Sequence, residues 1–243
     1  MSAKTKNQEL QLFITLSSVF IASLVSCNLI FQKFFSINIW LPFIGDYTFE
    51  QSVGLLAYPI TFLVTDIISE IYGRKRANQV VTSGLIASAF MLLLVIVSDS
   101  IQSAAFGTGN VFAINPSTGK EENIFHIVFG LSSAAVFASM VAYLFAQFID
   151  VRLFHFWKNL TKGKHLWLRN NASTVFSQCI DTFLVLFLLC YFNVIPWEKF
   201  GPYFINGFLF KVFFAAFDTP FFYLFSNILK NKFGLKLNEE VSF

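Results

Sequence analysis

Six long apolar stretches constrain this chain of 243 residues more than any other feature. A hydrocarbon layer about 30 Å thick requires roughly 20 apolar residues in a helix that crosses it. We predict six such helices, at residues 10–34, 52–71, 78–98, 125–149, 172–194 and 203–229. The predicted fold class is an all-α polytopic membrane protein in which residues 1–243 form a single transmembrane domain.

The composition excludes a water-soluble fold. Hydrophobic residues make up 56% of the chain and charged residues only 13%, about half the charged proportion of a typical soluble domain. Phenylalanine alone occupies 34 positions. A soluble domain of this size could not bury so many aromatic side chains without leaving large apolar patches on its surface.

The basic residues predict how the helices are oriented. Thirteen lysine and arginine residues fall in the two terminal tails and in the connections 72–77 and 150–171, whereas the opposite side carries three. Because basic loops are retained in the cytoplasm, we predict that both termini and these two loops are cytoplasmic. The net charge of +3 is therefore interpreted as a topology signal, and nucleic acid is not an expected partner.

The connections on the other side differ from one another. Residues 35–51 combine aromatic residues with turn formers such as Gly45 and Asp46, and we predict a short hairpin or an interfacial segment there. Residues 99–124 are rich in serine, glycine and asparagine and are predicted to form a loop.

No metal site or cofactor is predicted. Cys27, Cys179 and Cys190 lie in apolar stretches, and the sequence contains no C-x-x-C pair and no histidine at ligand spacing. An intramembrane enzyme would need a nucleophile with its base, or a metal site, inside the membrane. Because the three histidines lie at or beyond the ends of the predicted helices, we do not expect an enzyme.

Ionisable and amide side chains inside the predicted helices are the candidate functional residues. A charged side chain in hydrocarbon is costly, and it is tolerated where it faces a cavity or a partner. These residues are Asn28 in the first helix, Asp66 and Glu70 in the second, Gln178 and Asp181 in the fifth, and Lys211 and Asp218 in the sixth.

Two interpretations of these residues are open. In the first, Lys211 forms an ion pair with one of the acids and ties two helices together, and Glu70 pairs with Arg74 one turn later. This leaves acids without a basic partner. In the second, which we favour, Asp181 and Asp218, both near the middle of the membrane, bind a polar ligand.

Pro220 in the sixth predicted helix and Asp150 at the end of the fourth are two further notable residues. Pro220 follows Asp218 by two residues and frees the carbonyl group of Ala216, and interrupted helices near the midplane are frequent at transporter binding sites. Asp150 closes the fourth predicted helix, and we interpret it, with Arg152, as an interfacial anchor.

Three segments resemble the signatures of the queuosine precursor transporter family, formerly grouped with vitamin uptake transporters. The run YPITFLVTDIISEIYGRKRA (residues 58–77) resembles the first signature. The runs AQFID, LWLRNNAST and QCIDT within residues 146–182 are similar to the second, and DTPF (residues 218–221) is similar to the third.

The resemblance implies a multi-pass protein of the bacterial inner membrane that imports a 7-deazaguanine base, preQ0, preQ1 or queuine, for tRNA queuosine. Such a base has a ring N–H beside an amino group, a donor pair that suits a carboxylate. On this reading the substrate-binding candidates are Asn28, Asp66, Gln178, Asp181 and Asp218. The gating or coupling candidates are Glu70 and Lys211, and Asp66 is also a candidate partner of Glu70 in a gating or coupling pair.

The main alternative is the substrate-binding subunit of an energy-coupling-factor-type vitamin importer. Such a subunit is also polytopic, but it requires a separate ATPase module, so uptake by this protein expressed alone distinguishes the two. The expected partners are the small-molecule substrate and the lipid bilayer, and a homo-oligomer is compatible with the sequence.

Overall fold

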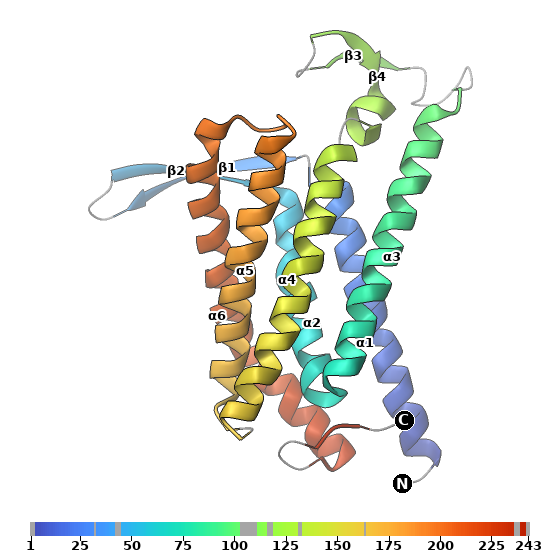
Figure 1. The fold of residues 1–243 in the computed structure, drawn as a ribbon, viewed down its shortest axis with the longest axis vertical. Coiled ribbons are helices and arrows are strands. Elements are labelled where there is room, and N and C mark those ends of the chain that lie inside the picture. Colours follow the sequence, from blue (N-terminus) through green and yellow to red (C-terminus); the bar gives the residue numbers. More distant parts are fainter. Residues whose placement is uncertain are drawn as a thin grey trace.

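The long helices of the chain run side by side along the long axis of the molecule (Figure 1). The computed structural model describes residues 3–31, 33–41, 45–102, 111–115, 119–130, 133–162, 164–235 and 239–241. Its long helices are α1 (Ala3–Ile30), α2 (Tyr58–Ile71), α3 (Gly73–Ser100), α4 (Ser133–Leu160), α5 (Leu166–Tyr191) and α6 (Phe200–Phe233). The shorter helical segments η1 (Val53–Ala57), η3 (His126–Gly130) and η4 (Trp197–Lys199) precede α2, α4 and α6.

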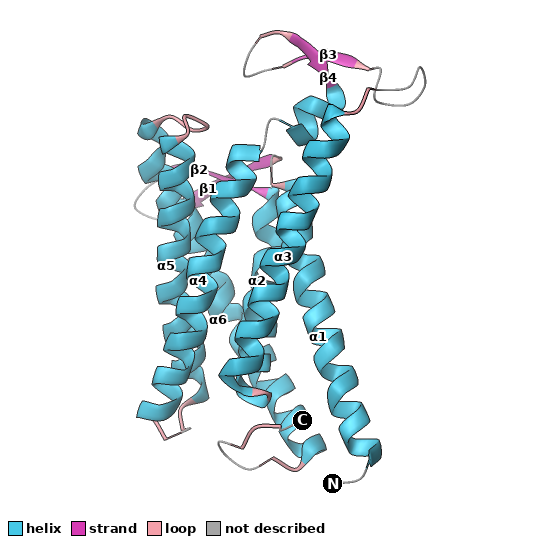
Figure 2. Ribbon diagram, turned by 45° about the vertical axis from the view of Figure 1, so that its right-hand side comes forward, coloured by secondary structure: helices cyan, strands magenta, loops and turns pink. Residues whose placement is uncertain are grey.

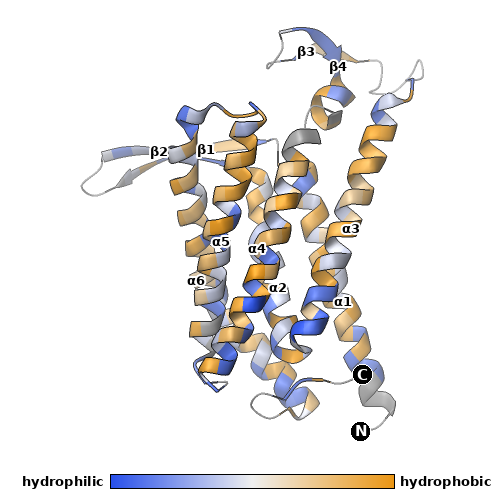
Figure 3. Cartoon of the chain, viewed as in Figure 1, coloured by the Kyte–Doolittle hydropathy of each residue, from blue (hydrophilic) through white to orange (hydrophobic). Residues whose placement is uncertain are grey.

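The prediction of six membrane-crossing helices is confirmed. Six segments of the described chain are long and apolar enough to cross a membrane, and the second of them is η1 continued by α2. Within lipid, a helix satisfies its backbone hydrogen bonds internally, which is why apolar sequences of this length fold in this way. Large apolar side chains such as Phe90 of α3 and Phe213 of α6 are more than half exposed. Figure 3 shows apolar residues along the middle of the helices, where they suit contact with lipid.

Helix α2 forms the centre of the bundle. Eleven of its fourteen residues are buried, and it contacts α1, α3, α4 and α6. The buried hydroxyl groups of Thr61 and Thr65 donate to main-chain carbonyl groups about one turn earlier in the same helix. Carboxylates cannot do this, so Asp66 and Glu70 depend on groups from neighbouring helices.

The turn between α2 and α3 is shorter than predicted. Because α3 begins at Gly73, the predicted loop 72–77 is helical from its second residue. Gly73 reverses the chain with a φ of +79°, which glycine adopts without strain. The Tyr72 hydroxyl donates to the main-chain carbonyl of Glu9 at 2.9 Å and fastens this turn to α1.

Helices α4 and α5 also extend into the predicted loop 150–171. Helix α4 ends at Leu160 and α5 begins at Leu166, so only a short turn joins them. Val151 and Phe154 are fully buried, and their packing continues the helix past its predicted end. A helix can continue beyond a bilayer surface, so the cytoplasmic location of this region stays a prediction.

Two β-hairpins lie toward the end of the molecule opposite the termini (Figures 1 and 2). Strands β1 (Phe34–Leu41) and β2 (Gly45–Ser52) pair antiparallel, with Phe34 opposite Ser52. Of the two forms predicted for residues 35–51, the structure contains the hairpin. Strands β3 (Phe112–Ile114) and β4 (Glu121–Asn123) form a smaller hairpin within the predicted loop 99–124.

The segment η1 joins the first hairpin to α2 and packs closely on α1. The Ser52 hydroxyl oxygen accepts the Gly54 N–H at 3.2 Å and caps η1. A Cβ atom at Gly54 would lie 2.7 Å from the main-chain oxygen of Cys27 and 2.8 Å from Phe31. The absence of a side chain at Gly54 therefore sets the spacing of η1 and α1, which together form one wall of a cavity.

Candidate functional site

A cavity of about 440 Å³ lies between α1, η1, α4, α5 and α6, beside the first hairpin. Small-molecule sites commonly have volumes of about 300–1,000 Å³. Polar side chains from several elements contribute to its wall, among them Asn28, Gln51, Tyr58, Ser139, Asp181 and Lys211. Residues far apart in the sequence thus converge on one site.

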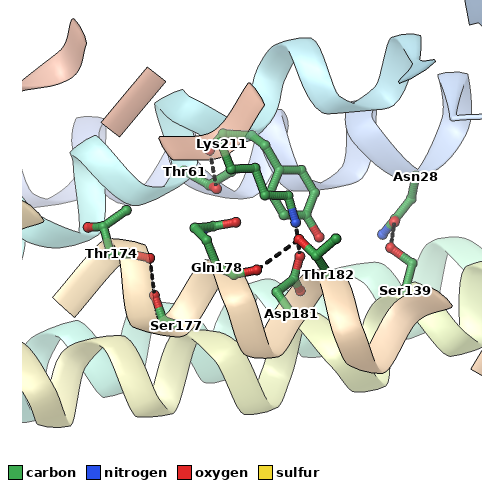
Figure 4. A network of polar contacts seen from close by, with 10 residues as sticks. Asn28, Thr61, Ser139, Thr174, Ser177, Gln178, Asp181, Thr182 and Lys211 are labelled. Atoms are coloured by element: carbon green, nitrogen blue, oxygen red, sulfur yellow. Dashed lines mark hydrogen bonds and ion pairs between the residues drawn. The ribbon is translucent and has the colours of Figure 1, made fainter. Parts of the chain in front are cut away.

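Asp181 of α5 and Lys211 of α6 form a buried ion pair in the cavity wall (Figure 4). Lys211 Nζ donates to Asp181 Oδ2, and the two side chains are 6% and 1% exposed. The Lys211 ammonium also lies 4.9 Å from the centroid of the Tyr58 ring, a favourable distance for a cation–π interaction. The structure therefore contains the ion pair of the first interpretation, with Asp181 as the acid.

One oxygen of Asp181 is not used by this pair. Oδ1 is buried and has no hydrogen-bond partner within the described chain. Buried carboxylate oxygens are nearly always hydrogen-bonded, because losing hydration without a replacement is costly. Asp181 is one of the residues that line the cavity, so a ligand bound there would lie close to its carboxylate group. The ion pair and ligand binding by Asp181 are thus compatible.

Asn28 contributes an amide group to the same cavity. Its Oδ1 accepts the Ser139 hydroxyl at 3.4 Å, and its Nδ2 donates to Ser88 Oγ at 3.5 Å. Both hydrogen bonds are long, so they orient the amide and leave it capacity for a stronger bond to a ligand. Figure 4 shows Asn28 and Ser139 facing each other across the space beside Asp181.

Aromatic rings form another part of the wall. Phe34 of β1 and Tyr203 of α6 stack with their centroids 6.2 Å apart and their planes at 24°, and Tyr58 adds a third ring. Flat apolar surfaces combined with a few polar groups suit a planar heterocycle. Phe34 and Tyr203 are lining residues that the sequence did not single out.

Gln178 and Asp218 line a separate and much smaller cavity of about 20 Å³. Lys211 and Tyr58 line both cavities and so lie between them. Gln178 precedes Asp181 on α5 and Asp218 follows Lys211 on α6, which places the small cavity nearer the termini. The structure therefore does not bring Asp181 and Asp218 together in one cavity.

Helix α6 continues through Pro220 to its end at Phe233. The proline therefore does not break the helix, although it has no N–H to donate to the carbonyl group of Ala216. The preceding residue, Thr219, turns its hydroxyl inward to the Ala215 carbonyl at 3.1 Å.

Asp66 and Glu70 lie further towards the C-terminal end of α2, and they are not among the residues that line the main cavity. Asp66 is about 12 Å along the helix axis from Tyr58, which lines that cavity. Glu70 accepts a hydrogen bond from Lys230 of α6 and is 1% exposed. The structure thus gives Glu70 a partner 160 residues away in the sequence, which local spacing could not indicate.

The interpretation of Asp150 as an interfacial anchor is wrong. The side chain is fully buried, and its Oδ1 accepts the Ser177 hydroxyl at 2.9 Å. The error arose because the fourth helix was predicted to end at this residue, whereas α4 continues well beyond it. The spacing of Ser139, Tyr143, Gln147 and Asp150, three or four residues apart, indicates one polar helix face and could have revealed the position.

The described residues include no group of three or more histidine, cysteine, aspartate and glutamate side chains that could hold a metal ion. Cys27, Cys179 and Cys190 are free thiols. The cavity therefore offers hydrogen-bonding and aromatic groups to a ligand.

Several known proteins are similar to this chain in sequence. Residues 52–225 match the family described as putative vitamin uptake transporter. A Bacillus subtilis (strain 168) protein named probable queuosine precursor transporter is 25% identical over 182 residues, covering 74% of this chain and 73% of that protein. A Haemophilus influenzae protein of the same name is 26% identical over 243 residues, covering 96% and 94%. The queuosine precursor transporter of Escherichia coli (strain K12) is 26% identical over 140 residues, covering 58% and 55%. No solved structure matches the chain.

Proposed function

The chain belongs to the family of putative vitamin uptake transporters, and on this basis we propose that it imports queuosine precursors. The names of the three relatives support this substrate class, and the six membrane-crossing helices support a multi-pass membrane protein. The substrates in this proposal are 7-deazaguanine bases such as preQ0, preQ1 or queuine, carried across the inner membrane of a bacterium.

The proposed direction of transport follows from the two ends of the molecule. Both termini lie at one end, and the first hairpin, which borders the main cavity, lies toward the other (Figure 1). With the termini in the cytoplasm, as the basic residues predict, the cavity is on the side from which an imported substrate arrives.

In this proposal the main cavity holds the base, with Asp181 as its principal contact. The free Oδ1 of Asp181 accepts hydrogen bonds from the ring N–H and the amino group of the base, while Lys211 occupies Oδ2. Asn28 donates its amide to the ring carbonyl, and the Tyr58 ring covers one face of the base. The observation that carries the proposal is that Asp181, which lines a cavity of about 440 Å³, has a buried carboxylate oxygen with no hydrogen-bond partner among the described residues.

Gln178 and Asp218 are proposed to contact the substrate later in its passage. They lie beyond Lys211 and Tyr58, on the side nearer the termini, in a cavity that holds little more than one water molecule. Passage therefore requires the Lys211 side chain to move. The half-buried Asp218 carboxylate suits the cationic amine that preQ1 and queuine carry.

Uptake by cells tests the proposed function. Bacteria that lack both queuosine synthesis and their own importer receive this gene alone and are fed each base separately, and queuosine in tRNA is measured. We expect queuosine with the wild-type protein and a decrease of about tenfold or more with Asp181→Asn, because a charge-assisted hydrogen bond contributes about 1.5–3 kcal/mol.

The control for this experiment is Asp46→Asn, the same chemical change at an exposed position of the first hairpin. Immunoblots of membranes show whether each variant is present in equal amount. Wild-type protein that is present but gives no queuosine would favour the alternative of a subunit that requires an ATPase. Equal queuosine with Asp181→Asn and wild type would exclude Asp181 as a substrate contact.

A further inference from the structure

A second polar cluster lies inside the bundle where α2, α4 and α5 meet, away from the main cavity. Asp66 of α2 is 2% exposed and Asp150 of α4 is fully buried. The Thr174 hydroxyl of α5 donates to Asp66 Oδ2 at 3.4 Å, and the Ser177 hydroxyl donates to Asp150 Oδ1 at 2.9 Å. Thr174 and Ser177 lie about one turn apart on α5, and the Ser177 hydroxyl also donates to the Thr174 carbonyl at 3.0 Å, so the same turn of α5 holds both carboxyl groups.

Among the described residues, several polar atoms of this cluster lack a hydrogen-bond partner, and its two acids lack a basic partner. Asp66 Oδ1, Asp150 Oδ2 and the amide nitrogen of Gln147 are buried and have no hydrogen-bond partner in the described chain. None of the ion pairs found among the described residues joins Asp66 or Asp150 to a basic side chain. Buried acids inside a membrane-spanning bundle are tolerated where they have a partner, so these oxygens favour a cation or a shared proton.

The groups that face the pair from neighbouring helices do not neutralise it. Asp218 of α6 adds a further acid, and Tyr143 of α4 is a phenol. Lys211 and Lys230 of α6 are engaged by Asp181 and Glu70. Two buried carboxylates held by the same turn of α5 cannot both keep an uncompensated charge in a low-dielectric interior.

We propose that Asp66 and Asp150 hold a monovalent coupling cation, either a proton or Na⁺, whose binding is linked to transport. The available ligands are carboxylate and hydroxyl oxygens, which suit a small hard cation, and two carboxylates can equally share one proton. This proposal rests on the proposed function and replaces the predicted pairing of Asp66 with Glu70 by a pairing with Asp150.

The link to the substrate passes through two shared helices. Helix α2 carries Asp66 in the cluster and Tyr58 in the main cavity, and α5 carries Thr174 and Asp181 in the same way. Figure 4 shows Thr174 and Ser177 on α5, further along the same helix from Asp181. A cation that draws α2, α4 and α5 together therefore changes the wall against which the substrate binds.

The test uses purified protein in liposomes and radiolabelled preQ0. Counterflow into liposomes loaded with unlabelled preQ0, without ion gradients, measures exchange and tests the proposed function by itself. Accumulation is then measured with two gradients applied separately, an inward proton gradient in sodium-free buffer and an inward Na⁺ gradient at equal pH. We expect one of them to raise wild-type accumulation severalfold, and that arm identifies the cation.

The variants separate coupling from transport. Asp150→Asn is expected to retain counterflow and lose gradient-driven accumulation, and Asp66→Asn is expected to lose accumulation as well. Ser177→Ala, which removes one hydroxyl ligand and leaves the carboxylates, is expected to raise the cation concentration needed for half-maximal accumulation. Asp46→Asn, at an exposed position, should behave like the wild type.

The outcomes that overturn the inference are distinct from failure of the proposed function. Counterflow without accumulation under either gradient shows that no cation is coupled. Wild-type accumulation in both Asp150→Asn and Ser177→Ala shows that the coupling site lies elsewhere. Absence of counterflow in the wild type contradicts the proposed function and, with it, this inference.

Discussion

At the scale of single residues, two buried ion pairs join helices of the bundle. Lys211 pairs with Asp181 and Lys230 pairs with Glu70, so α6 supplies the base and α5 or α2 supplies the acid. Removing one member of a buried pair leaves the other charged and dehydrated, which is more damaging than removing both. Loss of one member of the pair in the cavity wall is therefore expected to destabilise the protein.

We expect Lys211→Met to lower the free energy of unfolding by about 3–5 kcal/mol, because it leaves the Asp181 carboxylate buried without a cation. The double variant Lys211→Met with Asp181→Asn should recover most of this loss, since no unpaired charge remains. Thermal unfolding of the purified proteins in detergent measures both, with the exposed Lys33→Met as control. Equal stability of Lys211→Met and wild type would show that the pair does not form as described.

The sequence identified the polar residues inside the membrane-crossing helices, but it did not predict their partners on other helices. An acid or amide in an apolar stretch is visible in the sequence, and Asn28, Asp181 and Lys211 do meet at the main cavity. The partners are set by packing between helices, so local spacing indicates neither the Lys230–Glu70 pair nor the Ser177 partner of Asp150.

At the scale of elements, the main cavity depends on how closely η1 approaches α1. The contact is between backbones, because Gly54 lies against the Cys27 carbonyl and Phe31. Main-chain atoms cannot yield as a flexible side chain can, so a side chain at this position would force the two elements apart. The Asn28 amide belongs to the same stretch of α1 and would move with it.

Gly54→Ala is accordingly expected to cost about 1–3 kcal/mol of stability and to weaken uptake. Gly201→Ala is the matched control, because a Cβ there would have no atom within 4 Å and alanine favours a helix by up to about 1 kcal/mol. Melting temperatures and uptake of the two variants check this. Similar behaviour of both variants would contradict the close approach of η1 and α1.

The sequence predicted the number and kind of helices better than their ends. Apolar length fixes a membrane-crossing helix, and the six predicted stretches correspond to six helices. The ends of helices depend on packing beyond the apolar stretch, as at Val151 and Phe154, and on single backbone conformations, as at Gly73. Neither this packing nor a single backbone conformation produces a periodic pattern in the sequence.

At the scale of the whole molecule, the two ends of the bundle differ. At the end that carries the termini, the Val241 N–H donates to the Ile71 carbonyl at 2.8 Å, and Glu240 pairs with Lys158 at 3.0 Å. Toward the other end, the main cavity lies beside the first hairpin. Glu240 and Val241 therefore lie at the turn after α2, whereas the main cavity lies further from the termini.

The most direct measurement of the central claim is equilibrium binding of radiolabelled preQ0 to the purified protein in detergent. The account predicts saturable binding to the wild type and to Asp46→Asn, and an affinity lower by about tenfold or more for Asp181→Asn. If Asp181→Asn bound preQ0 as tightly as the wild type, or if the wild type bound none, the cavity at Asp181 would not be the substrate site.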